Sequence, residues 1–571
     1  MTNKHRWPAS TILLWVAPAC FLLLFYFYPL GKILSISLRR SPQGISAGLF
    51  EAIQSPVPWD TLGFTFWQAS LSTLLTLTVG LPGAYLFAHY TFRGKALLQA
   101  LTGIPFLMPT LVVAAAFNAL LGPGGWVNIG LMNLFHLASP PVQFTNTLTA
   151  ILVAHVFYNT TIVLRTVGDF WSHIDPRLNQ AARMLGANRW QAIRHVTLPL
   201  LMPAIAAAVL LVFIFDFTSF GVILILGGPR FSTLEVEIYY QTIALFNLPM
   251  AAFLSILQLA CTLGLTAVYT RLVRRLSIPI TLKSQAVTQR RLTNRSSRLS
   301  AGVIIVTLLV LLTLPLAALA IRSVTQLQPS QAGDVRSSPG FTLDFYRALE
   351  VNSNESVFYA PPTTAMAVSL GYAVATMLLS LVLGFPAAMA LARDTSSTIS
   401  HGLDTLLMLP LGTSAVTLGL GFIVALDKPP LDLRSSFLLV PLAHTLVAFP
   451  FVVRNLTPAL RSIRPRLRQA ATVLGATPGQ VIRYIDIPLI ARSIIVAATF
   501  AFTISLGEFG ATSLIARPQY PTIPIAIYRL IQRPGEVNYG QALALSTILM
   551  VVAGAGMLII NRWRVGEVGE F

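Results

Sequence analysis

Long apolar segments alternate with short polar loops along this chain. Each segment has about 20 apolar residues, the length at which a helix crosses a hydrocarbon core about 30 Å thick. Twelve segments can be placed in two sets of six, near 11–36, 63–90, 97–121, 147–168, 198–226 and 247–273, and near 299–321, 363–392, 402–426, 437–455, 488–515 and 540–561. The pattern predicts an all-α polytopic membrane protein with about 12 transmembrane helices.

One polar loop occurs twice, near 174–199 and near 463–488, each time between two apolar segments. The matching residues are Gln180, Ala181, Ala182, Gly186, Leu198 and Pro199 in the first copy and Gln469, Ala470, Ala471, Gly475, Ile487 and Pro488 in the second. Every residue of the first copy lies 289 positions before its counterpart. A polar loop whose residue spacing is identical in both halves of a membrane protein predicts a docking site for another protein.

The repeat extends beyond these loops. The same offset pairs His155 with His444, Arg165 with Arg454, Gly221 with Gly510, Thr233 with Thr522 and Tyr239 with Tyr528. Upstream, Gly-Leu-Pro at 80–82 resembles Gly-Phe-Pro at 384–386, at an offset of 304. We therefore predict two tandem six-span units in parallel orientation, residues 1–285 and 299–571, joined by a basic linker at 286–298.

Charge is sparse and positive, with 10% charged residues against 55% hydrophobic ones and a formal net charge of +19. A basic chain can bind nucleic acid, but here the Lys and Arg residues lie in short loops between apolar segments, as cytoplasmic loops do. Both repeat loops are rich in arginine, whereas the loop at 121–146 has no Lys or Arg. We expect a multi-pass protein of the cell's inner (cytoplasmic) membrane, surrounded by lipid, with the repeats and both termini in the cytoplasm and no nucleic acid partner.

The repeated loop has the features of a helical hairpin. In Gln-Ala-Ala-x-x-x-Gly, the small alanines leave one helix face open to close approach, and the glycine allows the chain to turn. A second helical stretch is expected near 188–196 and near 478–485, and it runs to a proline at the start of the next span. Such a compact hairpin suits a groove on a partner protein.

The full spacing continues for nine residues beyond the glycine to Val196 or Ile485, then one residue to Leu-Pro or Ile-Pro. The spacing of the repeated loop resembles the signature of permease subunits of ATP-binding-cassette importers. The duplication of the six-span unit resembles the fused type of permease found in iron(III) and thiamine importers. Both copies have Gln where the family usually has Glu, so this position can hydrogen bond but brings no charge.

The resemblance implies a pathway formed by both halves, fed by an extracytoplasmic binding protein and driven by ATPase subunits, two copies in all, that dock on the repeated loops. ATP and Mg would then bind the partner subunits, and this chain would bind no cofactor and catalyse no reaction. In agreement, the sequence has no Gly-x-x-x-x-Gly-Lys-Ser/Thr loop.

Two carboxylates, Asp216 and Glu508, lie within predicted spans. An unpaired charge in a membrane is costly, so such groups face a cavity or a partner. The offset places Glu508 at the position of Ser219, three residues from Asp216, so we expect the two acids to face one another near the outer ends of equivalent spans. Either they line the path of a cationic solute, together with Asn118 and Asn159, or they bond to neighbouring helices.

His155 and His444 are expected to form interhelical hydrogen bonds and not a metal site, because no further ligands occur at metal-site spacing. Cys20 and Cys261 have no partner motif. The alternative from another class is an ion-coupled secondary transporter, which also often has 12 spans in two halves.

Overall fold

The structure is a computed structural model that describes residues 9–39, 52–276 and 288–563, with gaps at 293, 330–334, 351–359, 394–397, 428 and 430. Ten helices in the described residues are long and apolar enough to cross a membrane. Two further candidate spans are helix pairs bent by 96° and 77°. The prediction of an all-α protein with about 12 spans is confirmed.

The elements of the first unit are α1 (Ala9–Leu22), η1 (Leu23–Phe27), α2 (Tyr28–Arg39), α4 (Pro56–His89), β1 (Tyr90–Thr91), α5 (Lys95–Leu107), α6 (Thr110–Leu121), α7 (Trp126–Phe135), α8 (Leu148–Ser172), α9 (Pro176–Met184), α10 (Arg189–Ala192), η2 (Ile193–Thr197), α11 (Leu198–Phe217), α12 (Gly221–Leu226), α13 (Leu234–Ile243) and α14 (Leu248–Leu276).

The linker contributes β2 (Arg290–Arg291). The elements of the second unit are α16 (Arg295–Arg322), β3 (Thr325–Pro329), β4 (Val335–Phe341), α17 (Asp344–Arg347), η3 (Ala348–Glu350), α18 (Pro362–Arg393), α19 (Thr398–Met408), η4 (Leu409–Gly412), α20 (Ala415–Ala425), α21 (Leu439–Ser462), α22 (Pro465–Val473), α23 (Pro478–Val481), η5 (Ile482–Asp486), α24 (Ile487–Leu489), α25 (Ala491–Gly507), α26 (Gly510–Ile515), α27 (Ile523–Gln532) and α28 (Glu536–Trp563).

Four of the predicted spans are broken. The segments expected at 97–121 and 402–426 each form two helices, and the second of these breaks where Ser414 accepts hydrogen bonds from the amides of Val416 and Thr417 to start α20. The segments expected at 198–226 and 488–515 end at Phe217 and Gly507, and short helices α12 and α26 follow. At Ser414 a local polar cap thus interrupts a run that hydropathy alone treats as continuous.

The two units exchange their first helices. Helices α1 and α2 pack on α18 and α20 of the second unit, while α16 packs on α4, α5 and α6 of the first. Tyr26 of η1 bonds to Thr413 with 2.6 Å between the two hydroxyl oxygens. The units are therefore interlocked and do not merely lie side by side.

Inside each unit the helices that pack most closely are α4 with α8 and α18 with α21. A glycine allows this approach in both: a Cβ on Gly80 would lie 2.7 Å from the side chain of Val163, and one on Gly384 would lie 2.6 Å from that of Val452. Small residues serve this purpose widely in membrane helix packing. The repeat seen in sequence is thus a repeat of helix contacts as well.

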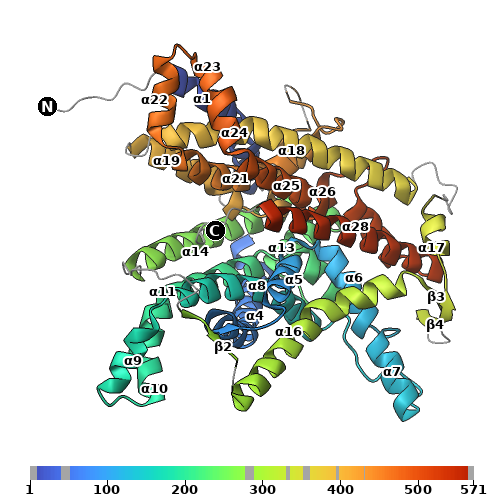
Figure 1. Cartoon of the computed structure of the whole chain (residues 1–571). Helices are drawn as coiled ribbons and strands as arrows, with labels where there is room; N and C mark the ends of the chain where they lie inside the picture. The colour runs from blue at the N-terminus through green and yellow to red at the C-terminus, as the bar shows by residue number, and fades with distance from the viewer. Residues whose placement is uncertain are drawn as a thin grey trace.

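The repeated loops project from one side of the molecule. In Figure 1, α9 and α10 protrude at the lower left and α22 and α23 at the upper left, whereas α7, α17 and the β3–β4 hairpin lie on the right. Both copies are therefore available to partners on the same side of the membrane.

The described part of the linker is attached to the first unit. Strand β2 pairs in parallel with β1, with Arg290 opposite Tyr90. Thr288 donates a hydrogen bond to the carbonyl of Ser172 at 2.6 Å. Residues 286–287 and 293 of the predicted linker lie outside the described residues.

Candidate functional site

Each repeated loop folds as the predicted helical hairpin. The turn is made by Gly186 with φ of 90° and by Gly475 with φ of 84°. In this left-handed conformation the next amide bonds back into the helix, from Ala187 to the carbonyl of Ala182 at 3.1 Å in the first hairpin. Only glycine adopts the conformation without cost, which explains its presence in both copies.

The second helix of each hairpin starts with a capping box. In the first, the amide of Asn188 donates to the Gln191 side chain and the amide of Gln191 donates to the Asn188 side chain, both at 2.8 Å. Thr477 and Gln480 form the same arrangement in the second hairpin. These caps define the direction in which each hairpin leaves the membrane-spanning helices.

The hairpin tips expose apolar side chains. Met184 and Leu185 are each 89% exposed, and their counterparts Val473 and Leu474 are 86% and 87% exposed. Of the twelve matching residues of the two loops, ten are exposed, while Ala182 and Ala471 are half-buried. Exposed apolar groups gathered at a turn are typical of a protein interface.

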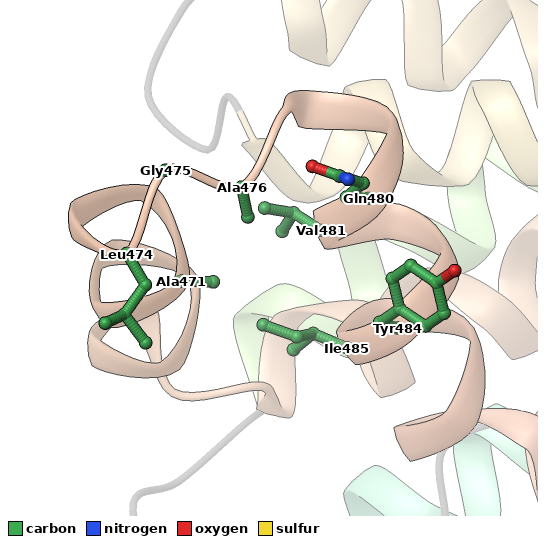
Figure 2. Close-up of a pocket in the computed structure, with 8 residues that line it drawn as sticks. All are labelled: Ala471, Leu474, Gly475, Ala476, Gln480, Val481, Tyr484 and Ile485. Carbon is green, nitrogen blue, oxygen red and sulfur yellow. The ribbon is translucent and has the colours of Figure 1, made fainter.

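Figure 2 shows the surface hollow between the two helices of the second hairpin. Ala471 on α22 points into it from one side, and Val481 and Ile485 point into it from the other. Its lining residues are Ala471, Leu474, Gly475, Ala476, Gln480, Val481, Tyr484 and Ile485. The small alanines therefore leave an open apolar recess beside the glycine turn.

The two hairpins differ in how their helices are joined. In the second, Arg468 of α22 donates to the carboxylate of Asp486 at 2.7 Å, and Asp486 is only 1% exposed. The counterparts of these residues at the 289 offset are Asn179 and Thr197, and the Thr197 hydroxyl donates to the Asn179 side chain at 3.0 Å. An ion pair in one hairpin thus replaces a neutral hydrogen bond in the other.

Alanine at Arg468 is expected to loosen the second hairpin more than alanine at Asn179 loosens the first. Removing the guanidinium leaves the Asp486 carboxylate buried with one partner fewer, which costs about 1 to 3 kcal/mol. Hydrogen exchange of the amides in α22 and α23 measures the effect. If both variants raised the amide exchange rates of their own hairpin equally, the stronger contribution assigned to the ion pair of Arg468 and Asp486 would be contradicted.

His155 forms the expected interhelical hydrogen bonds. Its Nδ1 lies 3.0 Å from the hydroxyl of Ser72 on α4, and its Nε2 lies 2.8 Å from that of Ser219, just beyond α11. Nδ1 is also 3.3 Å from the carboxylate of Asp216. One buried histidine therefore joins three helical segments.

His444 does the same in the second unit. Its Nδ1 lies 2.8 Å from the hydroxyl of Ser505, and its Nε2 lies 2.7 Å from that of Thr512. Nε2 is also 3.1 Å from the carboxylate of Glu508. The Glu508 carboxylate in turn accepts the amide of Ala511 at 2.7 Å, so it caps α26 as well.

The acid and the serine have exchanged places between the units. At the 289 offset, Asp216 corresponds to Ser505 and Ser219 to Glu508. Each histidine thus meets one carboxylate and one serine hydroxyl at the same two positions, in opposite order. The requirement conserved between the halves is an acid near the histidine, and either helix position satisfies it.

The predicted facing of Asp216 and Glu508 is wrong. Asp216 is fully buried and accepts from the Asn159 side chain at 2.6 Å within the first unit. The partners of Glu508 belong to the second unit, and its exposed fraction is 7%. Asn118 lies elsewhere, with its amide oxygen against Gly122 at the end of α6. The contacts favour bonding to neighbouring helices, and a role of these residues in the translocation path stays a prediction.

Glu235 is a buried group that the sequence did not single out. It is 1% exposed, accepts from Gln258 of α14 at 2.6 Å, and accepts from Ser414 of the other unit. Its counterpart at the 289 offset is Pro524, so a search for repeated residues passes over it. A carboxylate within the mainly apolar segment that forms α13 is the signal that could have identified this bridge between the units.

The fold and the two projecting hairpins define a polytopic membrane protein built from a tandem six-span repeat. A family model described as "Binding-protein-dependent transport system inner membrane component" matches the chain twice, over residues 77–278 and 380–563. The chain belongs to this family, and it is a fused permease of a binding-protein-dependent, ATP-binding-cassette import system. This membership decides against an ion-coupled secondary transporter.

Curated relatives cover nearly the whole chain. A thiamine transport system permease protein ThiP of Brucella abortus is 29% identical over 536 residues, covering 93% of this chain and 92% of that protein. ThiP of Escherichia coli is 27% identical over 530 residues, covering 92% and 90%. These relatives are transport permeases and not enzymes. A probable ABC transporter permease protein, y4fN of Sinorhizobium fredii, is 24% identical and covers 99% and 97%.

Solved structures of importers match over about half of the chain's length. A bacterial ABC transporter that imports alginate matches with a TM-score of 0.39 and 19% identity, covering 47% of this chain and 96% of that chain. The same kind of transporter in complex with an alginate-bound periplasmic protein matches with a TM-score of 0.38 and 19% identity, covering 46% and 93%.

Proposed function

We propose that this permease carries thiamine and is driven by two copies of a separate ATPase subunit that dock on the hairpins α9–α10 and α22–α23. The observation that carries the proposal is the pair of hairpins itself: equal in length, 289 residues apart and projecting from the same side. Two equivalent docking sites match two copies of one motor.

The chemistry of the hairpin surface supports a protein partner. The tips Met184–Leu185 and Val473–Leu474 are apolar and exposed, and the hollow beside Gly475 is open to solvent. Gln180 and Gln469 are exposed at the start of the motif and can hydrogen bond without requiring a cation on the ATPase. In this arrangement ATP and Mg bind the partner, and the hairpins transmit its closure to the spans.

Orientation follows from the same assignment. An ATPase that uses cellular ATP places both hairpins in the cytoplasm, and the arginines in and beside them agree with that side. An extracytoplasmic binding protein then docks on the opposite side, where α7, α17 and β3–β4 lie. Both termini then lie in the cytoplasm as well, because an even number of spans separates each terminus from a hairpin.

Thiamine is the proposed solute because two of the relatives are named as thiamine permeases and match the chain over nearly its whole length. Iron(III), the other solute that the sequence resemblance offered, has no such support from these relatives.

Reconstitution tests the proposal. The chain, its ATPase and its binding protein in proteoliposomes are expected to accumulate labelled thiamine only when ATP and Mg are supplied on the hairpin side. The chain alone under a proton or sodium gradient is expected to accumulate none. Uptake by the chain alone would overturn ATP-driven transport, and ATP-dependent uptake of iron(III) but not of thiamine would overturn the assigned solute.

A further inference from the structure

Four aromatic side chains meet where the two units come together. Phe220 and Phe509, counterparts at the 289 offset, stack with ring centroids 5.5 Å apart and planes at 22°. Tyr239 lies 5.5 Å from Phe220, and Tyr528 lies 5.4 Å from Phe509. The two tyrosines are counterparts as well. Because each residue meets its own counterpart, the pseudo-two-fold axis of the molecule passes through this aromatic quartet.

The quartet is closed in this structure. Phe220 is 7% exposed and Phe509 is 3% exposed. The backbone beside the stacked rings is closely packed, since a Cβ on Gly221 would lie 3.3 Å from the ring of Phe509 and 2.4 Å from the hydroxyl of Thr110. Both phenylalanines lie at the breaks between α11 and α12 and between α25 and α26.

Each ring is anchored to its own unit. The residue before Phe220 is Ser219, which bonds to His155 at 2.8 Å, and the residue before Phe509 is Glu508, which lies 3.1 Å from His444. A displacement of one unit relative to the other therefore carries the two rings apart. On the axis, the units are joined by the stacking of Phe220 on Phe509, a contact weak enough to break in a transport cycle.

We propose that the aromatic quartet is the gate of the translocation path, and that its ring faces contact a planar cationic solute as it passes. A solute that moves between two units related by an axis must cross the point where those units touch. An aromatic face attracts a cation, and this attraction replaces the stacking lost when the rings separate. The solute part of this proposal rests on the thiamine assignment above, because thiamine carries a positively charged aromatic ring.

Cross-linking tests the gate. In a chain with Cys20→Ser and Cys261→Ser, the pair Phe220→Cys and Phe509→Cys is joined by a short bifunctional thiosulfonate in the reconstituted complex. Thiamine uptake is expected to fall at least tenfold below that of the reduced double-cysteine chain and to return to that level when a reductant cleaves the link. The control pair is Tyr26→Cys and Thr413→Cys, which joins α1–α2 to the unit on which they already pack, and its cross-link should leave uptake unchanged.

A second readout requires no solute. A single cysteine at position 220 is expected to react with a water-soluble maleimide at least tenfold faster when an ATP analogue holds the ATPase subunits closed, because the rings have separated. Unchanged labelling, together with uptake that complete cross-linking leaves at the level of the reduced double-cysteine chain, would overturn the gate. Faster labelling without any thiamine uptake by the unmodified complex would leave the gate standing and reject thiamine as the solute.

Ring character is tested separately from bulk. Phe220→Leu with Phe509→Leu keeps apolar volume but removes the π faces, whereas Phe220→Tyr with Phe509→Tyr keeps them. Thiamine uptake is expected to fall at least fivefold in the leucine variant and less than twofold in the tyrosine variant, with ATP hydrolysis retained in both. Equal uptake in the two variants would reject the contact between rings and solute.

Discussion

Valine at both Gly186 and Gly475 is expected to abolish ATP-coupled uptake while the chain remains inserted in the membrane. The two glycines have φ of 90° and 84°, a conformation that a β-branched residue adopts only with strain of about 1 to 3 kcal/mol. No atom lies within 4 Å of the Cβ that either substitution adds, so the strain is confined to the hairpin turn and the spans are not overpacked. Uptake of labelled thiamine and ATP hydrolysis by the reconstituted complex measure the loss.

The matched control for this variant is Gly371→Val. Gly371 also has no atom within 4 Å of an added Cβ, but it lies in the exposed part of helix α18 with an ordinary negative φ. Uptake in the control should stay within twofold of the unaltered complex. Normal uptake and normal co-purification of the ATPase with the double variant would reject the docking role of the hairpins.

Replacing His444 with phenylalanine is expected to destabilise the second unit by about 3 to 5 kcal/mol, the usual result of removing one partner of a buried charge. The substitution keeps the ring but removes both ring nitrogens, which contact Glu508, Ser505 and Thr512. The apparent melting temperature of the detergent-purified complex should fall by several degrees.

A second variant separates the ion pair from simple packing. Glu508→Leu combined with His444→Phe removes the carboxylate that the single variant strands, so part of the lost melting temperature should return. In the first unit, Asp216→Ser combined with Ser219→Glu copies the arrangement of the second unit and should be tolerated better than Asp216→Ser alone. A double variant no more stable than its single variant in both units would show that the acid near the histidine contributes nothing.

Features that depend on local sequence or on the internal repeat were predicted correctly from the sequence. The spans follow from runs of apolar residues, and the hairpins follow from the spacing of Gln180, Gly186 and Pro199 and their counterparts. His155 and His444 were recognised as interhelical bonding residues because a buried imidazole needs partners and no ligand set accompanied either one.

Two expectations were wrong, the unbroken spans and the facing of Asp216 and Glu508, and both errors have a common physical origin. Hydropathy averaged over a span cannot detect a break made by one capping group, such as Ser414 or the Glu508 carboxylate. The offset correctly pairs Glu508 with Ser219 as equivalent positions of the two units. The direction of a side chain, however, depends on which helices surround it. Asp216 and Glu508 therefore each bond within their own unit instead of facing one another.

The sequence by itself determined the tandem six-span architecture, the two hairpins and the correspondence of residues from His155 and His444 onward, because these depend on hydropathy and on spacing along the chain. Only the tertiary structure decided which counterparts touch. Phe220 and Phe509 are separated by the same offset of 289, but only the packing of the two units brings their rings into a stack. Contacts between units far apart in sequence are set by packing, which no local pattern encodes.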